Sequence, residues 1–483
     1  MKKIALYLIV FLLTALYAIP AAAQIGNVYI HDPSTIVKCD GKYYTFGTGA
    51  GGLISEDGWT WHDGAVRTGG GVAPDVIKIG DRYLVSYSAG YPGTEGKTRG
   101  NVTTMWTKTL DPQSPDFGYT EPELVAWAGD DEDCWAIDPA FLLDPTTGRL
   151  WCSYGTYFGA IRIVELDPET GKRVAGNKAV DIAIDCEATA LMYKDGWYYL
   201  LGTHGTCCDG VNSTYNIVCG RSRSVTGPYL DNMGRDMLQG GGKMVLSAGN
   251  RATGPGHFGW YVEEEGVEKM SFHYEADYNR SGRSVLAVRS LLWKNGWPVA
   301  ADPFKEGTYE IESERRGYAL ELAVDFVRQQ GGMRAFRIDP NEPVVSLAEQ
   351  TLEEVEDRWP AGEIPVRAGD YMFRPHQRWT VTAVPDKGGY LGAPYYKITI
   401  AGTERALAAT EDGELVAVPQ YTGADEQLWR IEQLTDGTYR IMTKITCACG
   451  KHQKCLVSTG DSTVALGDYD FASDNCKWNF RDR

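Results

Sequence analysis

Three acidic residues in this sequence could carry acid/base chemistry. Asp32, Asp138 and Glu187 each open an apolar, strand-like stretch that leads through a turn into an aromatic stretch such as Tyr43-Tyr44-Thr45-Phe46. One carboxyl group can protonate a leaving oxygen, a second can activate water, and a third can raise the pKa of the acid by repulsion. If the three groups meet, they could hydrolyse a neutral substrate; otherwise they only cap turns, as aspartate often does.

The sequence motif that contains these acidic residues occurs five times. Its copies begin at Asp32, Asp75, Asp138, Glu187 and His257, and Asp75 is expected to be a structural turn residue. The copies begin roughly 40 to 70 residues apart and consist of short strands, which predicts the blades of a β-propeller. Because the first strand of each blade lines the central channel, equivalent residues converge at one end of it. The sequence therefore predicts an all-β, five-bladed propeller with three carboxylates around one opening.

A second repeat occupies the last part of the chain. Trp379, Trp429 and Trp478 recur about every 50 residues, and the first two follow the pattern Gln-x-Trp. This signature resembles the ricin-type β-trefoil lectins, in which three strand units pack around a pseudo-threefold axis with the tryptophans in the core. An insertion near 346–369, with an acidic run at 353–357 that could form a short helix, interrupts the first unit. Sugar binding and simple support of the propeller are both open roles for this domain.

The chain of 483 residues divides into three parts by pattern. Residues 1–23 carry two lysines, an apolar run and three alanines, which is the pattern of a cleaved signal peptide. Residues 24–305 form the expected propeller and 306–483 the expected trefoil-like domain. Because the apolar run is short for a membrane span, we expect an exported protein, periplasmic or extracellular, without membrane insertion.

Composition restricts the partners. A net charge of −17 argues against nucleic acid, whose binding depends on Lys and Arg, whereas 14 Trp and 28 Tyr suit stacking on sugars as well as all-β cores. Eleven cysteines in an exported chain favour disulfides, although Cys447, Cys449, His452 and Cys455 could also hold zinc. The sequence sets neither the disulfide connectivity nor the oligomeric state.

The ordered motifs between residues 27 and 298 resemble those of glycoside hydrolase family 43. The motifs are His31-Asp32-Pro33-Ser34, Ala73-Pro74-Asp75, Ala136-Ile137-Asp138-Pro139, Glu187-Ala188, the stretch from Cys207 to Tyr215, and Gly254-Pro255-Gly256-His257. The resemblance implies a five-bladed propeller in which Asp32 is the general base, Glu187 the general acid and Asp138 the residue that tunes and orients the acid. The family inverts the anomeric centre, so the carboxyl groups of Asp32 and Glu187 should lie roughly 6.5 to 9.5 Å apart.

The same resemblance implies an arabinofuranosyl polysaccharide or oligosaccharide as substrate. Endo-1,5-α-L-arabinanase is the first expectation, exo-acting α-L-arabinofuranosidase or β-xylosidase the alternatives, and a non-catalytic carbohydrate-binding protein the alternative of another class. Trp135, Ser213 and Tyr215 are the expected substrate-binding residues. Val72 stands where arabinanases usually carry a tryptophan, which leaves the linkage and the endo or exo mode open.

His273 matches a family histidine at the propeller axis, which in arabinanases holds a calcium ion or a cluster of waters. No cofactor is expected to be required, and a calcium there would be structural or would polarise the site. A buried histidine satisfied by the backbone is the alternative, because a hard cation needs several oxygen ligands and His273 offers one nitrogen.

Overall fold

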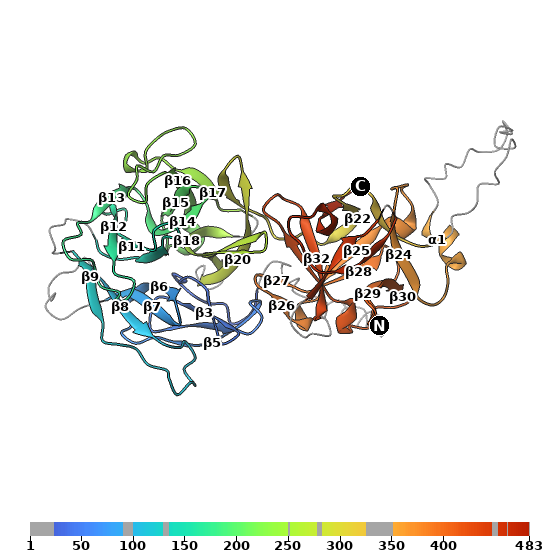
Figure 1. The fold of residues 1–483 in the computed structure, drawn as a ribbon, viewed down its shortest axis with the longest axis horizontal. Helices are drawn as coiled ribbons and strands as arrows, with labels where there is room; N and C mark the ends of the chain where they lie inside the picture. Colours follow the sequence, from blue (N-terminus) through green and yellow to red (C-terminus); the bar gives the residue numbers. More distant parts are fainter. Residues whose placement is uncertain are drawn as a thin grey trace, which may run out of the picture.

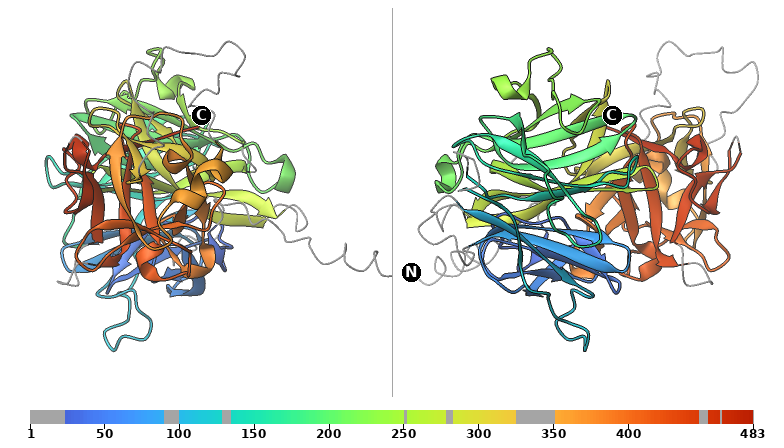
Figure 2. Two further views of the ribbon diagram at one scale, coloured as in Figure 1. Left: turned by 90° about the vertical axis from the view of Figure 1, so that its right-hand side faces the viewer. Right: turned by 60° about the vertical axis from the view of Figure 1, so that its left-hand side comes forward.

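The computed structural model describes residues 24–89, 100–128, 135–249, 252–277, 283–324, 351–446, 453–460 and 462–482. Two all-β domains lie side by side, a propeller coloured blue to yellow and a smaller domain in orange and red (Figures 1 and 2). The expected signal peptide, the first part of the insertion, and Cys447, Cys449 and His452 lie outside the described residues. Among the described helices, none has the length and apolar character needed to cross a bilayer.

Five antiparallel meanders form the propeller, as the repeat predicted. Each contributes four strands in chain order, and β1 (Ile25–Gly26) adds a parallel fifth strand to the first. The meanders are β2–β5 (Val37–Cys39, Lys42–Phe46, Gly51–Ser55, Thr60–Val66), β6–β9 (Val72–Ile79, Arg82–Ser88, Asn101–Thr107, Glu123–Trp127), β10–β13 (Ala140–Leu143, Leu150–Tyr154, Ile161–Leu166, Val180–Ala183), β14–β17 (Glu187–Lys194, Trp197–His204, Asn216–Ser222, Lys243–Leu246) and β18–β21 (Thr253–Glu264, Val267–Asp277, Arg283–Lys294, Trp297–Ala300).

Each pair of neighbouring blades encloses its own apolar cluster. Consecutive residues of one strand point to opposite faces, so Leu84 packs between the second and third blades while Val85 packs between the first and second. Leu200 and Leu201 divide in the same way between the clusters on either side of the fourth blade. The middle strands are therefore buried on both faces, which explains why they are apolar along their whole length rather than alternating.

The segment before Asp32 closes the ring of blades. Ile25 pairs with Thr60 of the first blade, and Tyr29 forms a bridge with Val285 of the fifth. The Ile30 N–H donates to the carbonyl of Ser284 at 3.2 Å. This closure fixes the chain between the first and last blades immediately before the predicted catalytic residue.

The second domain contains three equivalent four-strand units. They are β22–β25 (Gly307–Ser313, Ala319–Leu322, Ile364–Gly369, Trp379–Ala383), β28–β31 (Tyr396–Ile400, Ala406–Ala409, Leu415–Val418, Trp429–Gln433) and β32–β35 (Tyr439–Thr446, Gln453–Ser458, Val464–Gly467, Trp478–Arg481), with the short hairpin β26–β27 (Gly389–Tyr390, Ala393–Pro394) between the first two. The first and last strands of each unit pair with one another. The expected helix lies in the insertion as α1 (Leu352–Val355), followed by a 3-10 turn at Glu356–Arg358.

The three tryptophans occupy the predicted core positions. Trp379, Trp429 and Trp478 are fully buried. Their indole N–H groups donate to the carbonyls of Leu320, Leu407 and Leu456 at 2.8, 3.1 and 2.9 Å, at the same place in each unit. Burial of an indole is favourable only when its N–H is satisfied, so one hydrogen bond per unit repeats with the threefold symmetry.

A buried charge cluster joins the two domains. Glu432 of the second domain accepts hydrogen bonds from Arg430 and Arg440 and forms an ion pair with Lys269 of the propeller. Lys269 also donates to the carbonyl of Leu391 at 2.6 Å. Burial opposes ionisation of Glu432, but the three cations hold the pKa of its carboxyl well below the usual value. The domains are therefore fixed against one another.

We expect Glu432→Gln to destabilise the protein, because it leaves three buried cations around a neutral amide. Breaking a buried ion pair from one side costs about 3 to 5 kcal/mol. The free energy of unfolding in denaturant, followed by tryptophan fluorescence, measures the loss. The exposed Glu414→Gln in the same domain is the matched control. Equal unfolding midpoints for the two variants would contradict this role of Glu432.

Candidate active site

One residue in the left-handed backbone region stands at the entry to the inner strand of each blade. These residues are Asp32, Ala73, Asp138, Ala188 and His257, with φ values of 51, 45, 54, 46 and 54°. Non-glycine residues pay a strain of order 1 kcal/mol or more in this region, which persists only where surrounding contacts enforce it. The backbone therefore makes Asp32, Asp138 and His257 equivalent, whereas Glu187 lies one residue earlier than the repeat predicted.

Side chains from the preceding blade secure four of these residues. The N–H groups of Ala73, Ala188 and His257 donate to Thr48, Asp138 and Thr203, at distances of 3.0, 3.1 and 2.9 Å. The N–H of Asp32 donates to Nδ1 of His273 in the fifth blade at 3.1 Å. Each contact crosses a blade boundary, so the ring of blades itself holds the left-handed residues and aims their side chains at the axis.

Asp32 is held as a carboxylate. Thr48 Oγ1 donates to Asp32 Oδ2 at 2.5 Å, and His257 Nδ1 lies 3.2 Å from Asp32 Oδ1. Burial raises the pKa of Asp32, but the positive charge and hydrogen bond of His257 outweigh it, so the net pKa lies far below the usual value. In return, although burial lowers the pKa of His257, the charge of Asp32 raises it above its ordinary value. Asp32 therefore carries a fixed negative charge, balanced on one side by His257.

Asp138 and Glu187 have the opposite tendency. Burial, helped by the charge of Asp32, raises the pKa of Asp138 to about 7, against the opposing effect of His257. Burial together with the charge of Asp138 raises the pKa of Glu187 to about 8. The Tyr215 hydroxyl donates to Glu187 Oε1. Near neutral pH the site therefore combines an ionised Asp32 with a protonated Glu187, which is the division of roles that acid/base hydrolysis needs.

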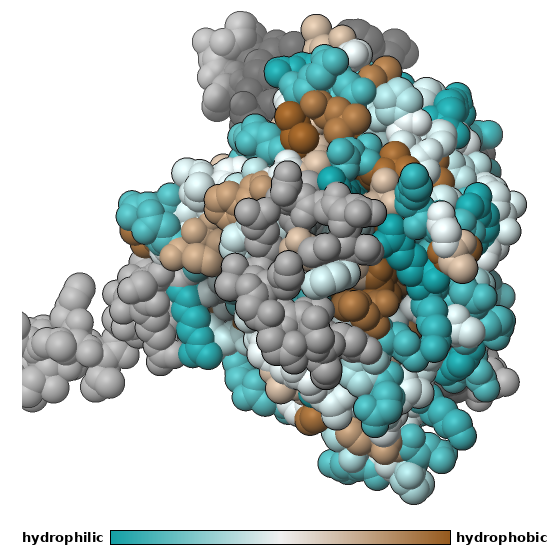
Figure 3. All heavy atoms as spheres, turned by 90° about the vertical axis from the view of Figure 1, so that its left-hand side faces the viewer, coloured by the Kyte–Doolittle hydropathy of each residue, from teal (hydrophilic) through white to brown (hydrophobic). Residues whose placement is uncertain are grey.

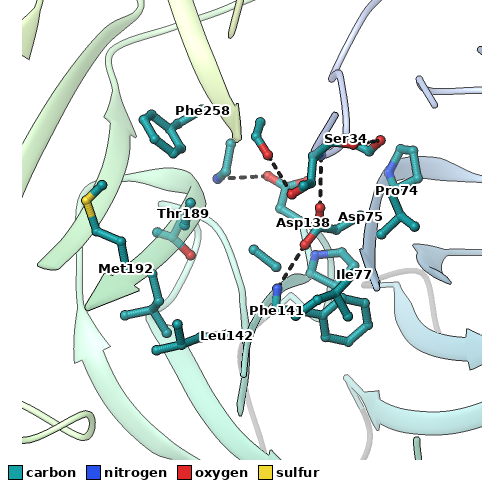
Figure 4. Close-up of a pocket in the computed structure, with 18 of the residues that line it drawn as sticks. Ser34, Pro74, Asp75, Ile77, Asp138, Phe141, Leu142, Thr189, Met192 and Phe258 are labelled. Carbon is teal, nitrogen blue, oxygen red and sulfur yellow. Dashed lines mark hydrogen bonds between the residues drawn. The ribbon is translucent and has the colours of Figure 1, made fainter. Parts of the chain in front are cut away.

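Asp75 is structural, but it lies within β6 and bonds the neighbouring blades instead of capping a turn as the sequence predicted. Its two carboxyl oxygens accept the N–H groups of Thr35 in the first blade and Phe141 in the third, at 3.0 and 2.9 Å. Figure 4 shows Asp75 between these blades, beside a cavity with a volume of about 320 Å³ that Asp138 also lines. Its walls are largely apolar, with Phe141, Leu142, Met192 and Phe258 among them. Asp75 thus ties three blades together along the channel.

His273 lies beside Asp32 and is fully buried. Burial and the neighbouring His31 lower the pKa of His273 to about 3, so the ring is neutral. Since Nδ1 accepts the N–H of Asp32, the proton of the neutral ring is on Nε2. His31, Asp32 and His273 bring three ligand-type atoms within 4.8 Å of one another, but two are imidazole nitrogens, whereas calcium prefers six to eight oxygens. The set does not fit a directly bound calcium ion.

The three expected substrate-binding residues lie in different surroundings. Trp135 is partly buried and its ring packs against Phe158 at 5.3 Å, while Tyr215 contacts Glu187. Ser213 is buried in the loop that carries Cys207 and Cys208, where its Oγ accepts the N–H of Asp209 at 3.2 Å. Their contact with substrate remains a prediction.

Sequence reasoning missed two features of the opening. The first is Phe158, which is 58% exposed and whose ring centre lies 4.5 Å from that of Tyr157. Burial raises the pKa of the Tyr157 hydroxyl, and the nearby charges of Glu187 and Asp138 raise it further. The second concerns His257, which heads the fifth copy of the repeat and ends the motif Gly254-Pro255-Gly256-His257, but neither pattern predicts its contact with Asp32. Its place at the head of the fifth copy was the signal that could have identified it as a residue of the site.

A second cavity, of about 570 Å³, lies next to Asp32. Its lining includes His31, Thr48, Cys208, Glu275 and Arg283, so it is far more polar than the channel. The face of the propeller turned away from the second domain is mainly hydrophilic, with small separate hydrophobic areas (Figure 3). Polar pockets with a few aromatic walls suit sugars, which present both hydroxyls and apolar faces.

A propeller that gathers one ionised and two protonatable carboxyl groups at its axis has the site of a glycoside hydrolase. Residues 51–298 match the pattern of glycosyl hydrolases family 43, and residues 375–449 match the ricin-type beta-trefoil lectin domain-like family. The chain therefore belongs to glycosyl hydrolase family 43, an inverting family. Its C-terminal domain is of the ricin-type trefoil kind.

Proteins similar to this chain act on arabinan. An extracellular exo-α-(1→5)-L-arabinofuranosidase of Cellvibrio japonicus is 32% identical over 59% of this chain and 91% of its own. An extracellular endo-α-(1→5)-L-arabinanase of Bacillus subtilis is 30% identical over 58% of this chain and 91% of its own. The structure of a Cellvibrio cellulosa α-L-arabinanase complexed with arabinohexaose, 27% identical, covers 57% of this chain and 96% of that one with a TM-score of 0.51.

Tyr215→Phe should raise the pKa of Glu187 above its value of about 8, because the lost hydrogen bond stabilises the ionised carboxylate. Carbon NMR titration of labelled glutamate, with Glu187→Gln to assign the signal, measures this pKa without substrate. Tyr193→Phe, at the far end of β14, serves as control. An unchanged or lower pKa in Tyr215→Phe would show that the hydroxyl does not stabilise the ionised form.

Proposed function

We propose that this protein is an exported endo-1,5-α-L-arabinanase. The observation that carries the proposal is the opposed ionisation of two carboxyl groups at one opening, with the pKa of Asp32 held low and that of Glu187 raised to about 8. A protein that only binds carbohydrate has no need of a buried, protonated glutamate beside a buried, ionised aspartate. The extracellular relatives support export, which the N-terminal sequence pattern also predicts.

In the proposed reaction Asp32 is the general base. Its carboxylate takes a proton from a water molecule, whose oxygen attacks the anomeric carbon from the face opposite the leaving group. His257 and Thr48 stabilise the charge of Asp32 before the proton is transferred and orient its two oxygens. Both side chains therefore keep the base ionised and fixed in position.

Glu187 is the proposed general acid. Its proton passes to the glycosidic oxygen as the bond to the anomeric carbon breaks, so the leaving sugar departs as a neutral alcohol. Asp138 keeps this proton on Glu187 by repulsion and, through its bond to the N–H of Ala188, fixes the backbone next to the acid. No cofactor is needed, because side chains perform both proton transfers.

The substrate class rests on the relatives and on the surroundings of the carboxyl groups. Arabinan-cleaving proteins stand among the similar sequences and structures, and both endo- and exo-acting names occur. Tyr157 lies near Glu187 and packs against Phe158, which packs against Trp135, while His31 and Thr48 next to Asp32 line the polar cavity. Contacts near both carboxyl groups suit a polysaccharide that extends across the site. They therefore favour an endo-acting arabinanase over an exo-acting arabinofuranosidase or a β-xylosidase.

Removal of either proposed catalytic group should abolish most turnover. Glu187→Gln keeps the shape but has no proton to donate, so kcat on linear arabinan should fall by about 10² to 10⁴, and Asp32→Asn should be at least as damaging. Reducing-sugar release and product sizes measure this. The unaltered protein is assayed in the same way on linear arabinan, branched arabinan, arabinogalactan and xylan. An oligosaccharide ladder supports endo cleavage, monosaccharide alone supports the exo alternative, and parental rates in either variant would refute the roles.

The pH dependence of kcat/KM should show an alkaline limit near pH 8, because the acid must be protonated and its pKa is raised to about 8. Activity is present below this pKa and is lost as the pH rises through it. Asp138→Asn removes a repelling charge, so the alkaline limb should move to lower pH while the rate falls. A limb that stays in place or moves to higher pH would show that Asp138 does not raise the pKa of Glu187.

A further inference from the structure

A vicinal disulfide lies beside the proposed general base and takes no part in the hydrolysis described above. Cys207 and Cys208 are bonded to one another, and Cys208 is exposed. The two sulfurs and one ring nitrogen of His31 lie within 4.8 Å of one another. Cys208 Sγ is 3.6 Å from His31 Nε2. A tetrahedral zinc ion, with Zn–S of about 2.3 Å and Zn–N of about 2.0 to 2.1 Å, separates such a pair by about 3.6 Å.

The ring of His31 is oriented as a metal ligand. Its Nδ1 lies 3.0 Å from Ser284 Oγ, and Ser284 Oγ in turn donates to Glu275 Oε1 at 3.4 Å. Ser284 therefore accepts the Nδ1 proton, which leaves the lone pair of the neutral ring on Nε2. The other polar contact of Nε2, with Asp32 Oδ1 at 3.5 Å, is longer than an ordinary hydrogen bond and does not reverse this assignment. Such outer partners are what fix the tautomer of a ligating histidine.

The loop that carries the two cysteines has its own hydrogen bonds. The Thr206 N–H donates to Thr214 Oγ1 at 3.0 Å, and the Thr214 N–H donates back to the carbonyl of Thr206 at 2.9 Å. The Asp209 N–H donates to Ser213 Oγ at 3.2 Å. Because these bonds do not depend on the disulfide, its reduction leaves the two thiols next to His31.

We propose that reduction of Cys207–Cys208 creates a site for one thiophilic divalent cation of the zinc and cadmium class, held by both sulfurs and His31 Nε2. A thiol or phosphine reductant cleaves the sulfur–sulfur bond and is itself oxidised, to a disulfide or a phosphine oxide. The cation then replaces the two thiol protons, which pass to the buffer, and forms two bonds to sulfur and one to nitrogen.

Occupancy of this site inhibits hydrolysis, an effect that rests on the proposed function. Asp32 Oδ1 lies 3.5 Å from His31 Nε2, so a cation on this nitrogen adds positive charge beside the base. The cation and its bound water then occupy the space next to the Asp32 carboxylate, where the attacking water must lie. His31 and Cys208 also line the polar cavity of about 570 Å³, so the ion takes space from the substrate.

Metal counting tests the site without substrate. The full-length protein is reduced with a phosphine, freed of reductant under inert gas and titrated with Cd²⁺, and native mass spectrometry counts the ions bound per chain. We expect the reduced protein to bind one ion more than both its oxidised form and the reduced double variant Cys207→Ser/Cys208→Ser. Cys39→Ser, which removes a buried thiol elsewhere, should retain that ion, and His31→Ala should bind it at least about tenfold more weakly. Equal counts in the reduced protein and the double variant would overturn the site.

Inhibition is tested separately, with each protein normalised to its own rate on linear arabinan before Cd²⁺ is added. We expect the hydrolysis rate of the reduced protein to fall at least about tenfold and to recover when a chelator removes the ion. The oxidised protein and the double variant should keep their rates. An unchanged rate in the reduced, ion-bound protein would overturn the inhibition. If no protein cleaves arabinan before the ion is added, the proposed substrate is wrong, and the ion count still decides the site.

Discussion

The negative charge of Asp32 is the constraint on which the rest of the site depends. His257 and Thr48 hold the carboxylate of Asp32 in place, and the backbone N–H of Asp32 donates to His273. Two further carboxyl groups then share a buried space with an existing charge, so both resist ionisation. One fixed anion thus gives three similar carboxyl groups different tendencies to ionise, as the proposed roles of base, proton donor and modulator require.

The blades supply this charge with its partners. Contacts that cross a blade boundary hold the left-handed residues at the axis, and Asp75 binds the first and third blades from within the second. Asp32 and His257 come from the two ends of the propeller sequence, so their contact requires the ring to be closed. The second domain adds a buried ion cluster against the fifth blade, and this interface favours a supporting role for it.

Much of this could be predicted because the repeat carries the information. Asp32, Asp138 and Glu187 stood near the heads of their copies, and Trp379, Trp429 and Trp478 were predicted as core residues from their spacing. The one-residue offset of Glu187 could not be predicted, since only the backbone conformation reveals it. The pairing of Cys207 with Cys208 and the contact of His257 with Asp32 also depend on distances between side chains, which neither composition nor periodicity specifies.

The proposed mechanism places Asp32 and Glu187 on opposite faces of one sugar, with a water molecule between the base and the anomeric carbon. Proton NMR of linear arabino-oligosaccharide hydrolysis, recorded before the products mutarotate, tests it most directly. We expect the first new reducing end to be the β-anomer, because single displacement inverts the α-linkage. An α-anomer as the first product would mean that a side chain attacks the sugar, and would contradict the assignment of Asp32 as a base acting through water.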